Sequence, residues 1–288
     1  MKNKIIEINN KDFPEKLKKI KDMPQKLYAI GNLELLYKDC FAIVGTRRIS
    51  EYGIKNCQFF SKELVLRDIP IVSGMAIGTD TVAHKTALEY GGTTIAVLGS
   101  GFNNIFPESN IDLFEEIISK NGLIITEFEQ DIKPVKGNFP KRNRIITALS
   151  EGVLVIEAAY RSGTSITAAN ARKQGKKVFA LPGKLDSPVG IGVNRLIKEG
   201  AVLTTNVEDI LMSYPQFMYR KRKTYEKKVF KEENNLIYQC IDDGKYIDEI
   251  LEECGLEFNS VIEIITKLEI DNYIYLDIDG RYKKRWVK

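Results

Sequence analysis

Short runs of apolar residues alternate with amphipathic stretches along most of the chain. The apolar runs are rich in Val and Ile and predict buried strands, at residues 40–44, 70–72, 94–98, 123–126, 153–157, 178–181 and 201–203. Stretches with helical spacing lie between them, at residues 52–66, 79–90, 111–120, 143–150, 164–174 and 190–199. Strand–helix alternation of this kind is typical of a parallel sheet that helices cover on both faces. The pattern therefore predicts an α/β fold with a doubly wound, mostly parallel sheet.

The segments on either side of this pattern are organised differently. Residues 1–35 are too few for a domain of their own, and one amphipathic helix is predicted around 13–21. We therefore expect a short N-terminal helical segment, followed by a Rossmann-like domain at 36–213. Residues 214–231 form a basic run with a Pro and no core pattern, which predicts a linker.

The last part of the chain, residues 232–288, has a pattern of its own. Three short helices are predicted, within residues 233–242, 247–255 and 259–270. Two strands follow them, and the dipeptide Asp279-Gly280 between these strands is typical of a type I′ hairpin. Three helices and a hairpin outline a small winged-helix-like module.

The charge of the chain is distributed unevenly. The 288 residues carry 43 Lys and Arg against 39 Asp and Glu, a formal charge of +4. Residues 1–231 hold 36 basic and 25 acidic side chains, whereas residues 232–280 hold 2 basic and 14 acidic ones. A basic body favours polyanionic partners, and an acidic module repels them.

Composition excludes several other classes of protein. With 43% apolar and 28% charged residues, the chain is neither intrinsically disordered nor a disulfide scaffold. No apolar run approaches the ~18 residues needed to span a bilayer, and the N-terminus has no secretory signal, so we expect no membrane association. The four cysteines show no CxxC spacing, so we expect no metal site and a cytoplasmic protein.

Small residues follow several of the predicted strands. They are Gly45-Thr46-Arg47 after the first strand, Ser73-Gly74 and then Gly78 after the second, and Ser162-Gly163-Thr164 after the fifth. Such residues let backbone N–H groups and helix N-termini approach a ligand, and the carboxyl ends of parallel strands line one crevice. The repetition predicts an anion site there, for phosphate above all. No complete Walker A or dinucleotide motif is present, which speaks against an NTPase or an NAD enzyme, and we expect no cofactor.

Residues 133–144 hold five basic residues and one aromatic residue, with no acid. The basic side chains that could contact phosphates are those of Lys136, Lys141, Arg142 and Arg144. Phe139 offers a face for a base. Basic groups along a backbone, together with an aromatic ring for stacking, are what single-strand binding requires. The alternative is a solvated loop whose Phe139 only anchors it to the core.

Three other polar residues have both a functional and a structural interpretation. His84, the single histidine, could be a general base, but no nucleophile is tied to it by spacing, and a structural histidine bonded to a neighbouring loop is favoured. Asp80 would cap the helix that starts there or orient His84. Glu157 could act as an acid or base or hold a backbone turn, and the turn is favoured.

Four ordered motifs resemble those of a known family. They are FAIVGTR at 41–47, SGMAIGTDTVAH at 73–84, GNFPKRNRII at 137–146 and ALPG at 180–183. With these motifs at this spacing, the chain resembles the DNA-processing protein A family (DprA, also called Smf). The resemblance implies an extended Rossmann domain that binds single-stranded DNA, forms a homodimer and is not an enzyme. It also implies protection of incoming DNA and loading of the recombinase RecA in natural transformation.

The resemblance further implies which residues contact DNA. In that family the residues matching Arg47, Lys136 and Phe139 do so, and the match is less direct for residues 142–144. With the small residues at the strand ends, the expected single-stranded DNA site comprises Gly45, Thr46, Arg47, Ser73, Gly74, Gly78, Lys136, Asn138, Phe139, Lys141, Arg142, Asn143, Arg144, Ser162, Gly163 and Thr164.

An enzyme is the competing interpretation. The stretch 157–164 faintly resembles the PGGxGT loop of nucleoside-5′-monophosphate phosphoribohydrolases, in which glycines bind a phosphate and a glutamate assists glycosidic cleavage. Ala158 and Ala159 stand where that family has paired glycines, which makes the pocket less open to a nucleotide.

The acidic module carries a hypothesis of its own. A winged helix commonly binds duplex DNA through a basic recognition helix, but residues 259–270 carry Glu263 and Glu269 against Lys267. We expect this helix to stay out of a DNA groove and the module to engage a protein or the basic body.

Overall fold

The computed structural model describes the chain except for residues 1–3, 224–231, 242–243, 271–272, 278 and 285–288. The chain divides into two compact units, Met1–Tyr225 and Glu226–Lys288, and each is considered by itself. In the described ranges, no helix combines the length and the apolar character that crossing a bilayer requires.

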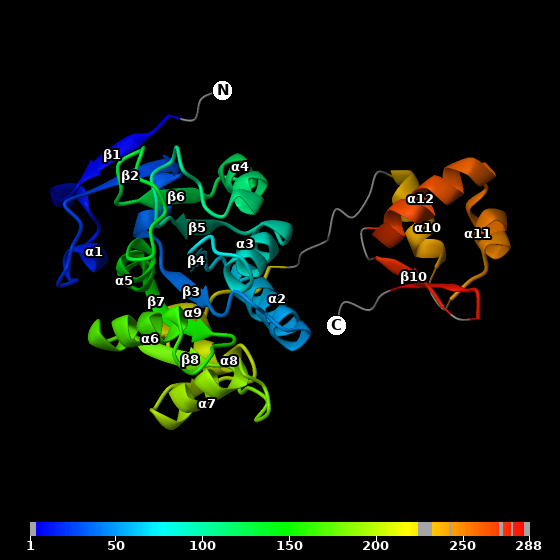
Figure 1. The fold of residues 1–288 in the computed structure, drawn as a ribbon. Helices are drawn as coiled ribbons and strands as arrows, with labels where there is room; N and C mark the ends of the chain where they lie inside the picture. The colour runs from blue at the N-terminus through cyan, green and yellow to red at the C-terminus, as the bar shows by residue number, and fades with distance from the viewer. Residues whose placement is uncertain (1–3, 224–231, 242–243, 271–272, 278, 285–288) are drawn as a thin grey trace. The chain divides into compact units, whose positions relative to one another are not determined.

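Within the described residues, the larger unit is built on a sheet of nine strands in the order β1-β2-β6-β5-β4-β3-β7-β8-β9 (Figure 1). The strands are β1 Ile6–Asn9, β2 Lys26–Gly31, β3 Cys40–Val44, β4 Ile71–Ser73, β5 Thr94–Val97, β6 Leu123–Thr126, β7 Ser150–Val155, β8 Lys177–Ala180 and β9 Val202–Leu203. Strands β3 to β9 run parallel to one another, whereas β1 and β2 pair antiparallel with their neighbours. The predicted α/β fold with a mostly parallel sheet is confirmed.

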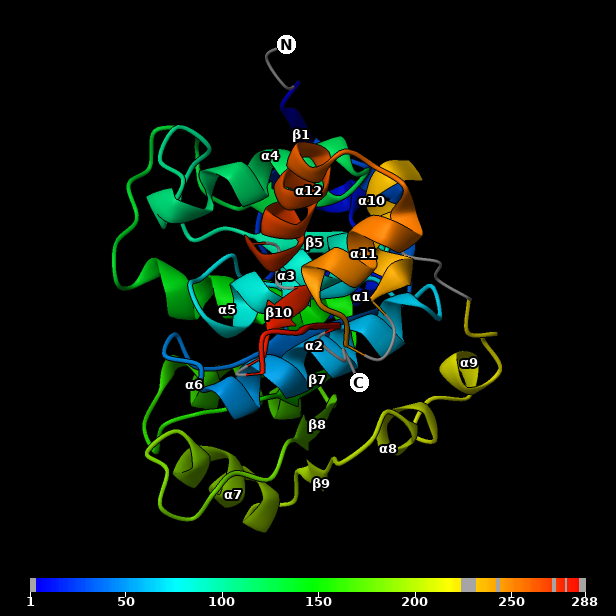
Figure 2. The same ribbon diagram turned by 90° about the vertical axis from the view of Figure 1, so that its right-hand side faces the viewer.

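Helices cover both faces of this sheet. The longer ones are α2 Glu51–Val65, α3 Thr79–Glu89, α4 Ile111–Ser119, α5 Asn138–Leu149, α6 Gly163–Lys173 and α7 Gly190–Lys198. The short ones are η1 Asn10–Asp12, α1 Glu15–Lys18, η2 Leu33–Tyr37, η3 Glu108–Asn110, α8 Glu208–Leu211 and α9 Pro215–Met218. One layer holds α1, α5, α6 and α7, and the other holds α2, α3, α4, α8 and α9. Figure 2 turns the right-hand side of Figure 1, with α2, α3 and α4, toward the viewer.

Strand β3 shows how the sheet separates two hydrophobic layers. Its five residues are all buried. Successive side chains of a strand point to opposite faces, so Ala42 and Val44 pack with α5 and α6, whereas Phe41 and Ile43 pack with α2. A strand that is apolar at every position is therefore what a sheet covered on both faces requires.

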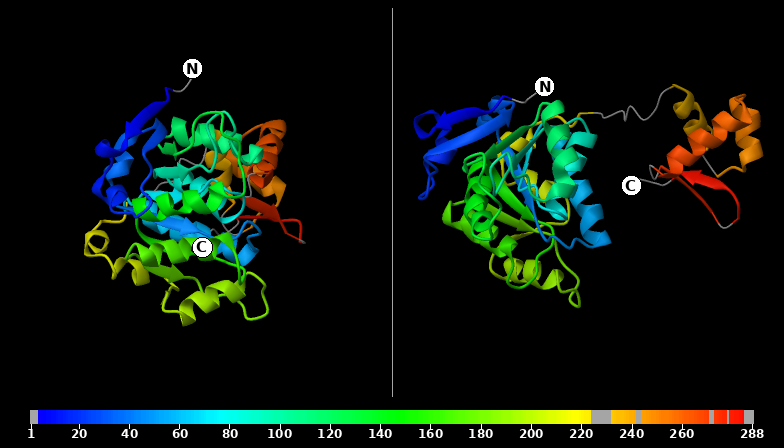
Figure 3. Two further views of the ribbon diagram at one scale, coloured as in Figure 1. Left: turned by 60° about the vertical axis from the view of Figure 1, so that its left-hand side comes forward. Right: turned by 45° about the horizontal axis from the view of Figure 1, so that its top comes forward.

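The N-terminal segment differs from the expected separate helix. Its helix α1 has four residues only, and β1 and β2 extend the main sheet past β6 (blue in Figure 3). Phe13 and Leu17 are buried in the core of the larger unit. Residues 1–35 are too few to bury an apolar face alone, so they gain stability by adding two strands to an existing edge. The four consecutive apolar residues Leu27–Ile30 were the signal for β2.

The expected linker begins later than residue 214. Residues 215–218 form α9, and the Phe217 side chain is 0% exposed. Its ring lies 6.3 Å from that of Phe41 and 5.3 Å from that of Tyr214, between centroids. The sequence signal for this packing was the pair of aromatic residues Tyr214 and Phe217, three positions apart in the basic run. The remainder of the expected linker, from residue 224, lies outside the described residues.

The smaller unit has a hydrophobic core of its own. Its elements are α10 Glu232–Cys240, α11 Ile247–Cys254, α12 Phe258–Ile270, β10 Ile274–Leu276 and β11 Tyr282–Lys284. Ile237, Ile250, Val261 and Ile265 are among the side chains that meet in this core. The three predicted helices and the hairpin are thus present, and their assignment as a winged helix stays a prediction.

The hairpin of the smaller unit is not closed by the expected two-residue turn. Leu276 pairs with Tyr282, and the Asp277 N–H donates to the Arg281 carbonyl at 2.8 Å. This register leaves more residues between the paired positions than a type I′ turn centred on Asp279-Gly280 contains. Gly280 still adopts a positive φ of 81°, so it serves the bend within a longer loop.

Candidate nucleic-acid interface

The basic segment and several strand ends meet in one crevice of about 410 Å³. It lies beyond the carboxyl end of β3, where α5 and α6 begin. The predicted site residues that line it are Gly45, Thr46, Arg47, Lys136, Phe139, Arg142, Asn143, Ser162, Gly163 and Thr164. Ser73, Gly74, Gly78, Asn138, Lys141 and Arg144 lie outside this lining. Residues from three separate parts of the chain thus converge, as expected for the carboxyl edge of a parallel sheet.

Arg47 and Phe139 face each other at this crevice. The Arg47 guanidinium carbon lies 5.2 Å from the centroid of the Phe139 ring, within the range of a cation–π contact. Arg47 is exposed and Phe139 is half-buried. The ring rests on Gly99, because a Cβ at that position would lie 2.8 Å from a ring carbon. Phe139 is therefore supported from below while part of its surface stays open to solvent.

A second aromatic ring, that of Phe106, adjoins Phe139 and was not predicted. The two ring centroids are 5.8 Å apart and the planes are tilted by 47°. Phe106 is 42% exposed, although a large apolar side chain of this kind usually finds cover. Its place in a loop, next to Pro107, carried no periodic signal in the sequence.

Two backbone loops at the crevice are held together by Thr46, Gly78 and Thr79. The Thr46 carbonyl accepts hydrogen bonds from the backbone N–H and the hydroxyl of Thr79, both at 3.1 Å. Gly78 has a φ of 81°, and a Cβ there would lie 2.5 Å from the Thr46 oxygen. Only glycine accommodates this approach, which fixes the loop that carries Arg47.

Arg142 is the main correction to the expected set of DNA contacts. The residue is 4% exposed, and its Nη1 donates to the carbonyl oxygens of Gly74 and Val97. Its Nε donates to the Asn143 side chain at 3.1 Å. A guanidinium engaged in this way braces α5 against the ends of β4 and β5. We therefore assign Arg142 a bracing role instead of the expected phosphate contact.

Asp80 is the buried counter-charge of Arg142. Its Oδ2 accepts hydrogen bonds from the backbone N–H groups of Gly74, at 3.1 Å, and Ala76, at 3.3 Å. Burial raises the pKa of Asp80, and Arg142 and these hydrogen bonds oppose the rise. Burial also lowers the pKa of Arg142 to about 10, which Asp80 opposes. Asp80 thus organises the loop after β4, instead of capping α3 or orienting His84.

Arg144 and Lys141 both interact with Glu127, and the expected DNA contact of Lys141, whose side chain is 56% exposed, stays a prediction. Arg144 forms a two-pronged ion pair with the Glu127 carboxylate, at 2.8 Å for each nitrogen, and its Nε donates to the Asp22 carbonyl at 2.7 Å. The Lys141 ammonium lies 3.3 Å from the same carboxylate. Arg144 therefore ties α5 to the N-terminal segment, and the expected phosphate contact is replaced by a structural one.

Hydroxyl and amide side chains at the strand ends connect backbones. Thr164 donates to the Gly45 carbonyl at 3.0 Å, and Ser73 donates to the Ile43 carbonyl at 2.7 Å. The Asn143 amide reaches the Gly163 carbonyl at 3.4 Å. Ser73 is fully buried, so its expected contact with a ligand is corrected to a contact between neighbouring strands.

The cations that remain available at the crevice are Arg47 and Lys136. Across the parts of the chain that the structure describes, neither forms an ion pair. Lys136 is exposed in the loop before α5, and the first turn of that helix has no acidic residue. The positive end of a helix macrodipole adds to these charges. The open part of the crevice therefore attracts anions.

His84 is a structural residue, as the favoured interpretation has it. It is fully buried, and its Nδ1 lies 2.7 Å from the Thr94 hydroxyl. Thr94 donates to the Ile71 carbonyl at 2.8 Å, so it accepts from His84, which places the proton on Nδ1. Burial, with a contribution from Arg142, lowers the pKa of His84 to about 3. A histidine that stays neutral and sealed from solvent is not a general base for a ligand in the crevice.

Glu157 holds a backbone turn, again as favoured. One carboxylate oxygen accepts from the Ser50 N–H at 2.9 Å and the other from the Ser50 hydroxyl at 2.5 Å. Ser50 is the N-cap of α2 and accepts from the Gly53 N–H. A Cβ at Gly53 would lie 2.5 Å from the carboxylate, which shows how closely the helix start fits around it.

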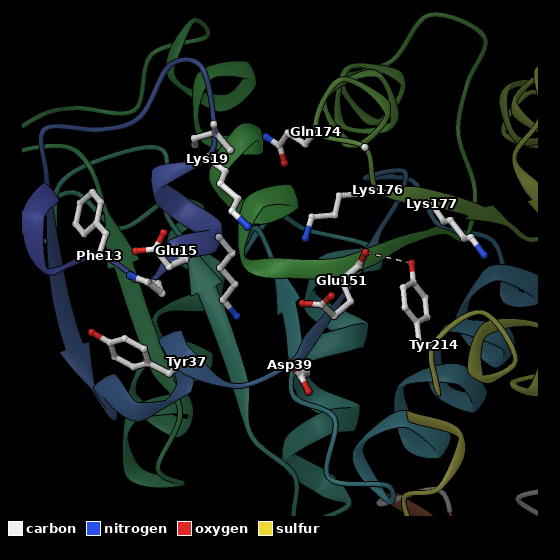
Figure 4. Close-up of a pocket in the computed structure, with 14 residues that line it drawn as sticks. Phe13, Glu15, Lys19, Tyr37, Asp39, Glu151, Gln174, Lys176, Lys177 and Tyr214 are labelled. Carbon is white, nitrogen blue, oxygen red and sulfur yellow. Dashed lines mark hydrogen bonds between the residues drawn. The ribbon is translucent and has the colours of Figure 1, made fainter. Parts of the chain in front are cut away.

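A larger cavity, of about 860 Å³, lies at the opposite edge of the sheet, where β7 and β8 begin. Figure 4 shows Lys19, Lys176 and Glu151 directed into it. Burial lowers the pKa of Lys176, and Glu151 opposes this shift. The acidic side chains of Glu15, Asp39 and Glu151 offset the lysines of its lining. No glycine loop of the kind at the crevice was predicted for this edge, and its mixed charges favour the crevice as the anion site.

Searching the described ranges, we find no group of three His, Cys, Asp or Glu residues that could hold a metal ion. The four cysteines are free and buried. Burial raises the pKa of the Cys40 thiol to about 12. Thiols held protonated in this way are poor metal ligands and nucleophiles.

Comparisons with known proteins show the family of this chain. Residues 4–215 match the family of DNA recombination-mediator protein A. Protein Smf of Escherichia coli is 36% identical over 278 residues, which is 94% of this chain and 74% of that protein. DNA processing protein DprA of Bacillus subtilis is 40% identical over 212 residues, 73% of this chain and 71% of that protein.

Two solved structures share the fold of the larger unit. DNA processing protein A of Streptococcus pneumoniae has a TM-score of 0.69 at 39% identity, covering 73% of this chain and 74% of that one. DNA processing protein A of Helicobacter pylori, a structure concerned with the single-stranded DNA binding mode of that protein, has a TM-score of 0.67 at 33% identity, covering 75% and 97%. The resemblance seen in the four motifs thus extends over most of the chain. By sequence and by fold, this chain belongs to the DNA recombination-mediator protein A family, that of DprA and Smf.

Proposed function

We propose that this chain binds single-stranded DNA in the crevice between β3, α5 and α6 and takes part in DNA recombination. The observation that carries the proposal is the Arg47 guanidinium, 5.2 Å from the half-buried ring of Phe139. A cation beside an open aromatic surface, in a groove lined by backbone loops, suits a flexible polynucleotide. The single-stranded DNA binding mode of the Helicobacter pylori relative supports the same ligand.

In this proposal the two parts of a nucleotide meet different groups. Arg47 and Lys136 hold backbone phosphates, together with the N–H groups at the start of α6. The open part of the Phe139 ring stacks on a base, which contributes about 1–3 kcal/mol per base and is tolerant of sequence. Binding is therefore nearly independent of sequence and weakens steeply with salt.

A pair of neighbouring arginines tests this proposal. Arg47 and Arg48 are both exposed, but only Arg47 is among the residues that line the crevice. Titration of a fluorescent oligothymidylate should show weaker binding for Arg47→Ala and for Phe139→Ala, with Arg48→Ala close to the unchanged protein. A matching duplex, measured beside it, reports strand preference. Equal effects of Arg47→Ala and Arg48→Ala, or no effect of Phe139→Ala, would show that the crevice is not the site.

We further propose the finer steps that the family suggests, namely a homodimer that protects incoming DNA and helps to load RecA. The recombination-mediator family supports this proposal. Light scattering measures the molar mass in solution. The rate at which RecA covers single-stranded DNA, with and without this chain, measures loading, and an unchanged rate would contradict it.

The phosphoribohydrolase interpretation depends on a free glutamate near the strand ends. Glu157 is instead bound through both oxygens to Ser50, so the geometry favours a binding protein. Incubation with AMP, followed by an assay for adenine, separates the two. Turnover of about 1 per second or more, which is typical of enzymes, would favour the enzyme.

A further inference from the structure

A second groove, of about 570 Å³, lies between α6 and α7. Its lining includes Tyr160, Arg161, Ser162, Gly163, Arg172 and Arg195. Apart from Ser162 and Gly163, none of these residues belongs to the site proposed above. The groove combines one exposed aromatic ring with several arginines.

Tyr160 is the central feature of this groove. It is 50% exposed. The guanidinium of Arg195 lies 4.9 Å from its ring centroid, and that of Arg161 lies 5.7 Å from it. The two nearby cations help to orient the ring, and its exposed surface offers a platform for stacking. The arrangement repeats that of Phe139 and Arg47 in the crevice.

The groove carries a surplus of positive charge. Glu199 pairs with Arg195 at 2.5 Å and with Arg172 at 3.1 Å, so one carboxylate serves two arginines. Arg161 is exposed and, judged on the described part of the chain, has no acidic partner. The two arginines that share Glu199 leave one positive charge unbalanced, and Arg161 adds a second. This surface therefore attracts anions.

The groove and the crevice are continuous at the start of α6. Ser162 and Gly163 line both. A Cβ at Gly163 would meet no atom within 4 Å, so the passage over this residue is open. The first turn of α6 begins at this point, where the positive end of the helix dipole favours a phosphate.

The far wall of the groove is held in a fixed position. Gly192, near the start of α7, donates its N–H to the Ala158 carbonyl at 2.9 Å. A Cβ at Gly192 would lie 2.3 Å from that oxygen, so α7 packs directly on the backbone that leads to Tyr160. The groove therefore exists before any ligand arrives, which lowers the ordering cost of binding.

We propose that the DNA strand continues from the crevice over Gly163 into the groove between α6 and α7, where Tyr160 stacks on a further base and Arg161 pairs with the phosphate that joins the two subsites. This inference rests on the proposed function, because it extends the same bound strand. It makes the binding site two-part, with Phe139 and Tyr160 as its aromatic platforms and the start of α6 between them.

Oligothymidylates of increasing length test the inference. A short oligomer occupies the crevice alone, so Tyr160→Ala should leave its affinity unchanged. For oligomers long enough to reach the groove, Tyr160→Ala should weaken binding by about 5- to 150-fold, the range of one stacked base. Tyr160→Phe should restore the affinity, because the ring is retained. Tyr219→Ala, which removes another exposed tyrosine of the same unit, is the matched control.

The outcomes separate the two proposals. Loss of binding with Phe139→Ala at every length, but no effect of Tyr160→Ala at any length, would overturn the inference and leave the proposed function intact. Loss with Tyr160→Ala alone would overturn the proposed site at Phe139. Photo-crosslinking of a 5-iodouracil oligomer adds a direct readout: adducts at Tyr160 with long oligomers support the inference, and their absence contradicts it.

Discussion

The cations of the basic segment 133–144 lie in two different environments. Lys136 and Phe139 lie in the loop and the first turn of α5, at the open part of the crevice. Arg142 and Arg144 lie one turn further along and are engaged with carbonyls and with Glu127. A helix rises about 1.5 Å per residue, so Arg142 lies about 4.5 Å further along α5 than Phe139, where it reaches the carbonyls of Gly74 and Val97.

This difference teaches that charge composition does not distinguish a cation that meets a ligand from one that braces a fold. Lys136 precedes α5 and is exposed, whereas Arg142 lies within α5 and is 4% exposed, so burial and bonding partners decide between the two roles. A bracing arginine contributes to the free energy of unfolding, whereas a ligand-facing lysine contributes to affinity and its salt dependence. The following predictions separate these contributions.

Removal of the Arg142 guanidinium should have the largest effect on stability. Arg142→Met leaves the Asp80 carboxylate buried without its counter-charge and should lower the free energy of unfolding by about 3–5 kcal/mol. Urea denaturation measures this loss. Lys136→Met should change stability by less than about 0.5 kcal/mol. If both variants unfold at the same urea concentration, the distinction between Arg142 and Lys136 is wrong.

The pH dependence of the free energy of unfolding should show that His84 is buried and neutral in the folded protein. The pKa of His84 is lowered to about 3, against about 6.5 in an unfolded chain. Between these values the unfolded state binds the extra proton, so stability falls as the pH drops from 6.5 toward 3, by up to about 1.4 kcal/mol per pH unit.

Comparison with His84→Gln isolates this contribution, because glutamine does not titrate. Unfolding should be followed at several pH values between about 4 and 6.5, where the histidine titrates in the unfolded chain. The slope of stability against pH should be shallower in the variant by about one proton. Equal slopes would show that His84 binds a proton in the folded protein.

A smaller loss of stability is expected from substitution of Gly74, which lies against the Arg142 guanidinium. In Gly74→Ala the new Cβ would lie 2.5 Å from the Arg142 guanidinium, so that group must shift away from its carbonyl partners. Overpacking of this kind costs about 1–3 kcal/mol. Gly163→Ala, where a Cβ meets no atom within 4 Å, serves as the control in the same denaturation experiment. A tolerated Gly74→Ala would mean that Arg142 has freedom to move.

The smallest effect should appear in the salt dependence of DNA binding. Lys136→Ala removes one phosphate contact and should reduce the slope of log K against log salt for single strands by about 0.7. Arg144→Gln should leave that slope unchanged, because Arg144 is paired with Glu127. Affinities measured between about 50 and 200 mM salt give both slopes. A reduced slope for Arg144→Gln would place it among the DNA contacts after all.

Much of the larger unit could be predicted from the sequence, because fully buried strands such as Cys40–Val44 must be apolar on both faces. Two parts could not. Strand β1 has a half-buried, alternating pattern of only four residues, which is weak without its partner β2. Phe217 lies in a basic run, and its packing on Phe41 depends on where the chain returns to the sheet.

The candidate site divides in the same way. Arg47 and Phe139 could be brought together in prediction, because the ends of parallel strands share one edge. Phe106 and Tyr160 could not, since exposed rings in loops carry no periodic signal. The burial of Arg142 and Arg144 was equally hidden, because their partners are backbone carbonyls and a glutamate distant in sequence.

By itself, the sequence determined the alternation of strands and helices, the small residues at the strand ends and the supply of positive charge near them, because each depends on local patterns that one chain position shares with its neighbours. Tertiary structure alone decided which of those charges stay open to a ligand. That choice depends on depth and on partners far away along the chain, and a cation whose donors are already satisfied by buried carbonyls or carboxylates has little left to offer a phosphate.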